Sequence, residues 1–404
     1  MTEAKSAESR PQEKRDWTRW LVLAATLLLA AWPRWLAFQS AQAQPLEHDA
    51  QTFFKLAGSP VSLWSASPRE PFFILLHRIA YLSLAGRPDA IRVQSLAFSF
   101  IMIGLVTGIA LRLFKSRAAA LLTGLVLAFT PFLAFQATRG LRLELFLSLA
   151  LALQATLTLS AKPLSRPRAA AAGILAAMLC LTRQVGILIA AGVFATAFIK
   201  LGTAHGWKRT GKALTLALGL ALLLTAPFYI AQARQYGRAF YIGVQDATFW
   251  RNQEFRDQPG HPSSAELLRD PYLGPPITPG EYMFGLHSPS QVLARVGKGY
   301  YLAFAWFYRQ AMDGFWWLLI LALPGAVVLC LRRREEWLVL FILVLGPFAF
   351  ILPLSVVGHQ SVDARFSMHG YPLVALFIGA GADWLFDFFR RARGEALNAK
   401  SQSR

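Results

Sequence analysis

The feature that most constrains this chain is a series of apolar segments, each about long enough to cross a lipid bilayer as a helix. A spanning helix needs about 20 apolar residues. Segments of this kind recur at residues 17–37, 90–113, 118–135, 141–160, 214–230, 315–331, 338–357 and 371–389. Another apolar run, 169–199, is too long for one span and is interrupted by Thr182-Arg183-Gln184, which predicts two short helices with Arg183 at the turn. The sequence therefore predicts an all-α membrane protein with about ten spans.

The composition agrees with a bilayer as the solvent. Only 16% of the residues are charged, whereas a soluble domain carries about 25%. The formal net charge of +19 would fit a nucleic-acid-binding protein, but the basic residues form short clusters between apolar segments rather than one basic face. We therefore expect membrane lipids, and no nucleic acid, as partners.

The basic clusters also predict the orientation, because cytoplasmic loops of membrane proteins carry an excess of Lys and Arg. With a cytoplasmic N-terminus, six clusters fall on the cytoplasmic face: Lys14/Arg15, Lys115/Arg117, Lys162/Arg166/Arg168, Lys200/Lys208/Arg209/Lys212, Arg332/Arg333/Arg334 and Arg390/Arg391/Arg393. We expect a multi-pass protein of the cell (inner) membrane with both termini in the cytoplasm.

This topology divides the chain into five parts. They are a cytoplasmic tail (1–16), an N-terminal transmembrane module (17–231) with a first outer loop (38–87), a long extracytoplasmic loop before span eight (232–300), C-terminal transmembrane helices (301–393) and a cytoplasmic tail (394–404). Segment 71–84 carries Arg78 and is too short to span, which predicts an interfacial helix in the first outer loop. In the long loop, Phe249-Trp250 and Tyr282-Met283-Phe284 predict the core of a small cap, with a stacking platform for a sugar or prenyl chain as the alternative.

Ionisable residues gather on the predicted outer face, next to the ends of spans. Charged side chains at membrane depth are costly and so mark functional sites. They occur in Glu47-His48-Asp49, in Arg69-Glu70, in the turn 139–144 with Arg142 and Glu144, at Arg183, and in the last outer loop with Asp363 and Arg365. Carboxylates beside arginines suit a site that binds an anionic lipid headgroup next to a general base.

Each of these residues also has a structural interpretation. Asp49 could be the N-cap of a helix that begins near Ala50, and Glu144 could complement the dipole of a first helical turn. Glu70-Pro71 resembles an ordinary helix start. Arg183 could snorkel to lipid headgroups, and Arg142 could bind lipid phosphate at the interface.

The order of these motifs resembles the C-type (GT-C) fold of integral membrane glycosyltransferases. More narrowly, it resembles the bacterial branch related to protein O-mannosyltransferases and aminoarabinose transferases. EHDAQTFFKLA is similar to their acidic outer-loop motif and SPREPFFILLHRIAYLSLAG to their proline-led interfacial helix, while LTRQVGIL and ARFSMHGYPLV are similar to two later signatures. The resemblance covers about the first 200 residues and, locally, the last outer loop, but not 233–300.

The resemblance implies a hexosyl- or pentosyltransferase that takes a sugar from a polyprenyl-phosphate-linked donor on the outer face. Asp49 then corresponds to the catalytic base, and Glu144 to a second acid that orients the acceptor, the sugar or a divalent ion such as Mg²⁺ or Mn²⁺. Arg183 and Arg365 correspond to arginines that hold the carrier phosphate. His48, Arg69, Glu70 and Arg142 complete the predicted substrate-binding set.

One departure from the family pattern bears on the metal. His48 stands where many relatives carry an acid beside the base. This weakens the case for a carboxylate pair in loop one and for a tightly bound metal. The acceptor, whether lipid, glycan or protein, is not specified by the sequence.

Two other function classes fit a multi-span chain. A transporter or flippase for a lipid-linked sugar would show internal repeats or helices broken at the bilayer midplane, and the sequence shows no similarity between its halves. An O-antigen ligase or polymerase relies on arginines and histidines of outer loops, without an acid after the first span. Asp49 is the residue that separates these classes from a C-type transferase.

Overall fold

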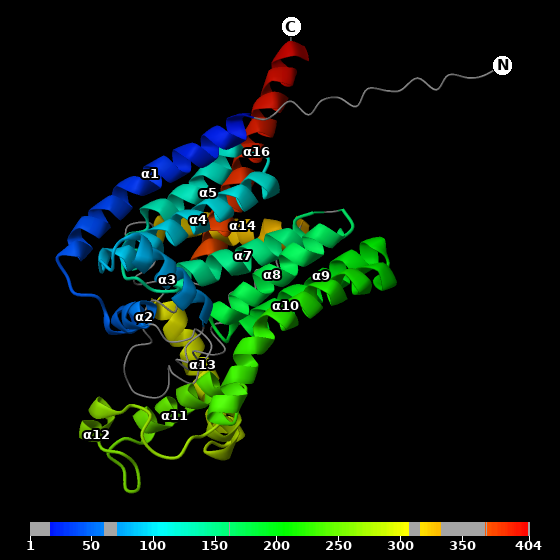
Figure 1. The fold of residues 1–404 in the computed structure, drawn as a ribbon. Helices are drawn as coiled ribbons and strands as arrows, with labels where there is room; N and C mark the ends of the chain where they lie inside the picture. The colour runs from blue at the N-terminus through cyan, green and yellow to red at the C-terminus, as the bar shows by residue number, and fades with distance from the viewer. Residues whose placement is uncertain are drawn as a thin grey trace.

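The computed structural model describes residues 17–59, 71–160, 162–306, 316–332, 368 and 370–402. All regular elements within these residues are helices, which confirms the predicted all-α fold. The long helices pack into one bundle, and a smaller group of helices forms a cap at one end of it (Figure 1).

The described helices follow one another in this order. The bundle begins with α1 (Trp17–Gln42), α2 (His48–Gly58), α3 (Pro71–Ser83), α4 (Asp89–Leu113), α5 (Arg117–Phe129), α6 (Pro131–Gln136), α7 (Leu143–Thr158), α8 (Arg166–Thr182), α9 (Gly186–His205) and α10 (Trp207–Tyr236). The cap contains α11 (Tyr241–Phe255), α12 (Ser264–Arg269) and the π-helical turn η1 (Glu281–Gly285). Then come α13 (Pro289–Trp306), the 3₁₀ turn η3 (Trp316–Leu318), α14 (Leu319–Arg332) and α16 (Tyr371–Gln402).

Among the described residues, five helices are long and apolar enough to cross a membrane, namely α1, α4, α9, α10 and α16. Four further predicted spans correspond to the shorter helices α5, α7, α8 and α14. The predicted span 338–357 lies outside the described residues, so the count of ten stays a prediction. Helix α8 ends at Thr182 and α9 begins at Gly186, which places Arg183 at the turn as predicted. Helix α16 runs on through the predicted tail to Gln402.

The third predicted span, 118–135, is not one helix. It breaks at Thr130, because Pro131 has no N–H to donate and its ring would clash with the preceding turn. The guanidinium of Arg34 fills the break: Nη1 donates to the carbonyl of Ala128 at 2.8 Å and Nη2 to that of Leu127 at 3.3 Å. Arg34 is only 1% exposed, so a buried cation on α1 caps the end of α5 inside the bundle.

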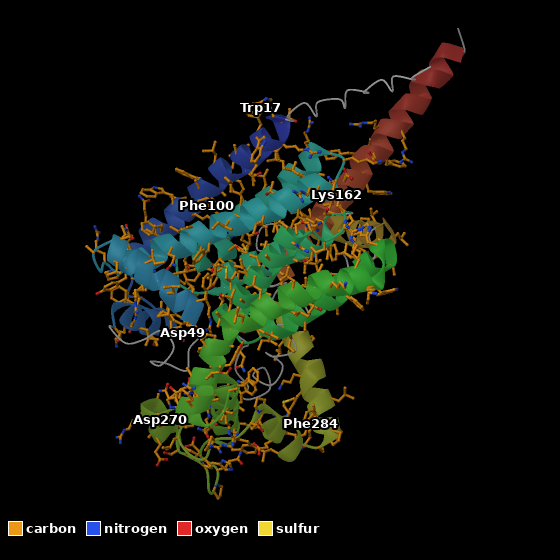
Figure 2. The ribbon with its side chains drawn as sticks, turned by 45° about the vertical axis from the view of Figure 1, so that its right-hand side comes forward. Trp17, Asp49, Phe100, Lys162, Asp270 and Phe284 are labelled. Carbon is orange, nitrogen blue, oxygen red and sulfur yellow. The ribbon has the colours of Figure 1, made fainter. Side chains whose placement is uncertain are left out.

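The two ends of the bundle carry the residues that the topology assigns to opposite faces. Figure 2 shows Trp17 and Lys162 towards one end and Asp49 towards the other, on the side of the cap that holds Asp270 and Phe284. This separation agrees with the prediction that Lys162 and Asp49 lie on opposite faces of the membrane, while the assignment of the cytoplasmic face stays a prediction.

The long predicted loop is a helical cap with its own small core. Trp250 and Tyr282 are buried there, as predicted, whereas Phe284 is 72% exposed. Glu254 accepts hydrogen bonds from Tyr282 Oη at 2.7 Å and from Arg295 Nη1 at 3.0 Å, and His287 Nε2 lies 3.0 Å from its other carboxylate oxygen. This network joins α11 to η1 and α13.

The network predicts an acid-sensitive cap. Partial burial disfavours the charged form of Glu254, but hydrogen bonds from Arg295, Tyr282 and His287 outweigh it and lower the pKa of this carboxyl below its ordinary value of 4.5. A carboxylate of this kind stabilises the fold above its unfolded-state pKa, and the contribution disappears as the pH falls through the folded-state pKa. We expect hydrogen-exchange protection of α11 and α13, corrected for intrinsic rates, to fall between about pH 5 and pH 3.

Glu254→Gln is expected to lower this protection already at neutral pH and to flatten its dependence on pH. Asp270→Asn, at an exposed position of the cap, is the matched control and should behave like the wild type. An unchanged pH profile in Glu254→Gln would contradict the assignment.

Candidate functional site

Helix α2 carries Asp49 at the end of the bundle that faces the cap. The helix begins at His48 with Glu47 as its N-cap, in an extended conformation and without a side-chain cap bond. The predicted alternative that Asp49 is the N-cap is therefore wrong, since Asp49 lies within the first turn. Its side chain is half-buried and shares a face of α2 with Phe53, one turn further on.

Three contacts attach α2 to the turn that precedes α7. Two nitrogens of the Arg139 guanidinium, Nε and Nη2, donate hydrogen bonds to the two carboxylate oxygens of Glu47. The guanidinium carbon of Arg142 lies 5.5 Å from the ring centroid of Phe53, within cation–π range. Gly140 has φ +72°, and a Cβ added to it would lie 3.4 Å from the Cβ of Ala50. The two predicted acidic segments thus form one cluster.

Helix α3 supports α2 from the other side. The ring of Phe73 meets that of Phe53 edge-on, with centroids 4.9 Å apart. Arg78 Nη2 donates to the carbonyl of Ser59 at 2.7 Å and Nε to that of Ala57 at 3.2 Å, so it caps the C-terminus of α2. The fully buried His77 contacts the side chain of Gln94 on α4. Helix α2 is therefore held at both ends.

Glu144 occupies the first turn of α7 and is only 1% exposed. Neither carboxylate oxygen has a hydrogen-bond partner, and the two cations whose charges act on it are Arg34 and Arg139. The predicted contact of Glu144 with acceptor, sugar or divalent ion stays a prediction. Its enclosed position, close enough to Arg34 and Arg139 for their charges to act on it, suits a residue that supports the site from inside the bundle.

Arg183 lies where the bundle meets the cap. It is the C-cap of α8, with an extended backbone, and its guanidinium carbon lies 5.9 Å from the ring centroid of Phe146 on α7. The neighbouring Gln184 side chain approaches Gly243 on α11. Beside this turn, Leu181, Phe228 and Ile242 form a buried cluster against Phe72 of α3. The predicted arginine turn therefore adjoins both the interfacial helix and the cap.

Several predicted residues cannot be placed. Arg69, Glu70 and Arg365 lie outside the described residues, as does the side chain of His48. Their predicted roles stay predictions.

The structure also reveals site residues that the sequence analysis missed. Arg34 lies near the end of the first predicted span, 17–37. A charged residue inside an apolar run is itself a signal of an important side chain. Glu47 was treated only as a neighbour of Asp49. Its pairing with Arg139, 92 residues away, has no local signature in the sequence.

The described residues do not fit a divalent metal. No group of three His, Cys, Asp or Glu side chains converges among them. Glu47 is occupied by Arg139, and Glu144 is enclosed in the bundle. Because Mg²⁺ and Mn²⁺ favour several oxygen ligands, we assign no step to a metal ion.

The buried charges predict a coupled loss of stability. Replacing Arg34 by Met leaves two carbonyls of α5 and the hydroxyl of Ser99 without their donor, and each unsatisfied buried group costs about 1–3 kcal/mol. In thermal inactivation of the purified protein, Arg34→Met should shorten the half-life strongly, and Glu144→Gln less so. The double variant Arg34→Met/Glu144→Leu should be more stable than Arg34→Met alone, with a coupling of about 1 kcal/mol or more. Additive effects would mean that the two residues do not interact.

Gly140 predicts a backbone constraint at the site. A side chain there is strained by the positive φ and would also lie 2.2 Å from Cγ2 of Ile91. Gly237 has nearly the same φ, +71°, but open space around it. Gly140→Ala should therefore lower stability by about 2 kcal/mol more than Gly237→Ala, measured by the shift in thermal denaturation. Equal shifts would show that the turn tolerates a side chain.

Comparison with known proteins places this geometry in a fold. No family model and no curated protein matches the chain. A crystal structure of the Archaeoglobus fulgidus oligosaccharyltransferase, in complex with Zn and sulfate, matches with a TM-score of 0.51 at 14% identity, over 94% of this chain and 51% of that chain. ArnT from Cupriavidus metallidurans, in the apo state, matches with a TM-score of 0.54 at 17% identity, over 95% of this chain and 64% of that chain.

The chain thus spans between about half and two thirds of the length of these two proteins. Both are membrane glycosyltransferases of the GT-C fold, one an oligosaccharyltransferase and the other an aminoarabinose transferase. At this level of identity the match concerns the fold. The chain has the GT-C fold of integral membrane glycosyltransferases.

Proposed function

We propose that this protein is a glycosyltransferase that moves a hexosyl or pentosyl group from a polyprenyl-phosphate-linked donor to an acceptor on the extracytoplasmic face. The observation that carries the proposal is the position of Asp49. It is a half-buried carboxylate at the outer end of a GT-C bundle, on a helix fastened to an arginine-containing turn. The two similar solved structures, both glycosyltransferases, support the same reading.

The proposed reaction is a displacement at the anomeric carbon of the donor sugar. The acceptor hydroxyl or amide attacks this carbon while the bond from the carbon to the carrier phosphate breaks, so the product is inverted. The acceptor proton passes to the carboxylate of Asp49, which acts as general base. The electron pair of the broken bond leaves with the phosphate, whose growing negative charge the arginines stabilise.

The phosphate is assigned to Arg142 and Arg183. Both guanidinium groups lie over aromatic rings, those of Phe53 and Phe146, and stacking fixes the plane in which a guanidinium donates to a phosphate. Arg139 is a weaker candidate because Glu47 already neutralises it. From the sequence, Arg365 belongs to the same set.

Glu144 has a different part in this proposal. Since its carboxylate is enclosed, we assign it as a positioning residue that acts through Arg34 and Arg139. In this role it would fix the positions of α1, α5 and α7 relative to one another, next to the turn that carries Arg142. His48, Arg69 and Glu70 remain candidates for contacts to the substrate, and the acceptor is a lipid, a glycan or a protein.

A transporter for a lipid-linked sugar is the second candidate. The break between α5 and α6 is the observation in its favour, because transporters often use broken helices to build a site. Arg34, however, already binds the carbonyls exposed by this break. The break therefore lacks the open carbonyls that an ion or substrate site would require.

The test of the proposal is the loss of one proton acceptor. Asp49→Asn keeps the size of the side chain but removes its basicity, so transfer should fall by about 100-fold or more, with normal insertion into the membrane. The measurement is mass spectrometry of surface glycans and glycolipids in a deletion strain complemented with each variant. Asp270→Asn, the same change on an exposed cap position, should retain transfer. Full transfer by stably inserted Asp49→Asn would refute the proposed mechanism.

A further inference from the structure

A pocket lies on the side of α2 that faces away from the bundle contacts. On one face of the helix, Ala50, Phe53 and Ala57 are buried. On the other, Gln51, Phe54 and Lys55 line a cavity of about 430 Å³ together with Gln44, Asp89 and Arg92. This volume falls in the range of about 300–1,000 Å³ that is typical of small-molecule sites. Three segments build the pocket, namely the α1–α2 linker, α2 and the start of α4.

Three charged side chains line the pocket, the cations Lys55 and Arg92 and the carboxylate Asp89. Arg92 is 6% exposed, and its guanidinium donates to the carbonyls of Gln44 at 2.6 Å and Thr138 at 3.2 Å. Asp89 and Glu47 are the carboxylates whose charges act on it. A phosphate placed here would face the carboxylate of Asp89, and of the two cations Arg92 is engaged with backbone oxygens. This lining lacks the cluster of available guanidinium groups that suits a phosphate, so we consider a neutral ligand.

The remaining groups match a sugar. A glutamine amide presents a donor and an acceptor side by side, the pattern that a pair of neighbouring hydroxyls complements. The amide of Gln51 is oriented by its own bond to the carbonyl of Leu46, at 2.7 Å. Asp89 accepts a hydrogen bond from Arg87 on Oδ2 at 3.4 Å, and its carboxylate has further acceptor capacity for sugar hydroxyls. Phe54 supplies an apolar ring against which the C–H face of a pyranose can pack.

We propose that this pocket binds a neutral, non-reacting sugar unit of the acceptor, which makes the acceptor a glycan or glycolipid. The inference rests on the proposed glycosyltransferase function and narrows its substrate class. Helix α2, which carries Asp49, also forms one wall of the pocket, and a helix with its side chains is about 10–12 Å across. A glycan that reaches around α2 would thus present one unit to Asp49 and another to the pocket.

The test is direct binding by saturation-transfer difference NMR, with the full-length protein in a detergent that contains no sugar. The probes are neutral methyl glycosides and short neutral oligosaccharides, and inorganic phosphate is the competitor. We expect at least one neutral saccharide to bind. Gln51→Ala, Asp89→Asn and Phe54→Leu should each weaken its binding about fivefold. Gln258→Ala, an exposed glutamine of the cap, should not.

The binding result and the activity result are independent. Asp49→Asn should bind the saccharide as the wild type does, because Asp49 does not line the pocket. If Asp49→Asn keeps full transfer, the proposed function fails even when the saccharide binds. The pocket proposal is overturned if no neutral saccharide binds, if binding survives all three pocket variants, or if inorganic phosphate displaces the sugar.

Discussion

The ion pair between Glu47 and Arg139 is the contact on which the arrangement of the outer face depends. It joins the start of α2 to the turn before α7, two segments 92 residues apart in the chain. Gly140, next to Arg139, brings the backbone of this turn against Ala50. The contact attaches the N-terminal end of α2, and with it Asp49, to the turn before α7. The general base proposed for Asp49 would need such a fixed position, because proton transfer in a transition state depends on geometry.

The buried charges extend the same support into the membrane-embedded part. Pro131 breaks the third span, and the break would leave carbonyls without donors in an apolar surrounding, which is costly. Arg34 supplies those donors. Its Nε also donates to the hydroxyl of Ser99 on α4 at 2.9 Å, so one guanidinium group joins α1 to both α4 and α5.

The sequence was sufficient for most of the fold and for part of the site. Apolar segments about 20 residues long predicted the helices. Arg183 in the middle of an apolar run predicted a turn, and local composition decides both features. The break at Thr130 was missed since a proline in an apolar run is tolerated when another chain segment supplies donors, and Arg34 is far away in sequence. The aromatic residues predicted the core of the cap, but not the network of Glu254, Tyr282 and Arg295 that organises it. Pairings between distant residues leave no local pattern.

Helix α2 connects these observations to specificity. Its two faces have different surroundings: Phe53 packs against α3 and Arg142, whereas Phe54 lines an open pocket with Gln51. Arg78 and Glu47 hold the two ends of the helix. A movement of the pocket face of α2 would therefore also move the face that carries Phe53. A ligand bound on the pocket face would therefore contact the same helix that carries Asp49, the proposed general base, in its first turn. In such an arrangement, binding energy from a remote sugar can position the reacting group, which is how non-reacting parts of a substrate contribute to catalysis.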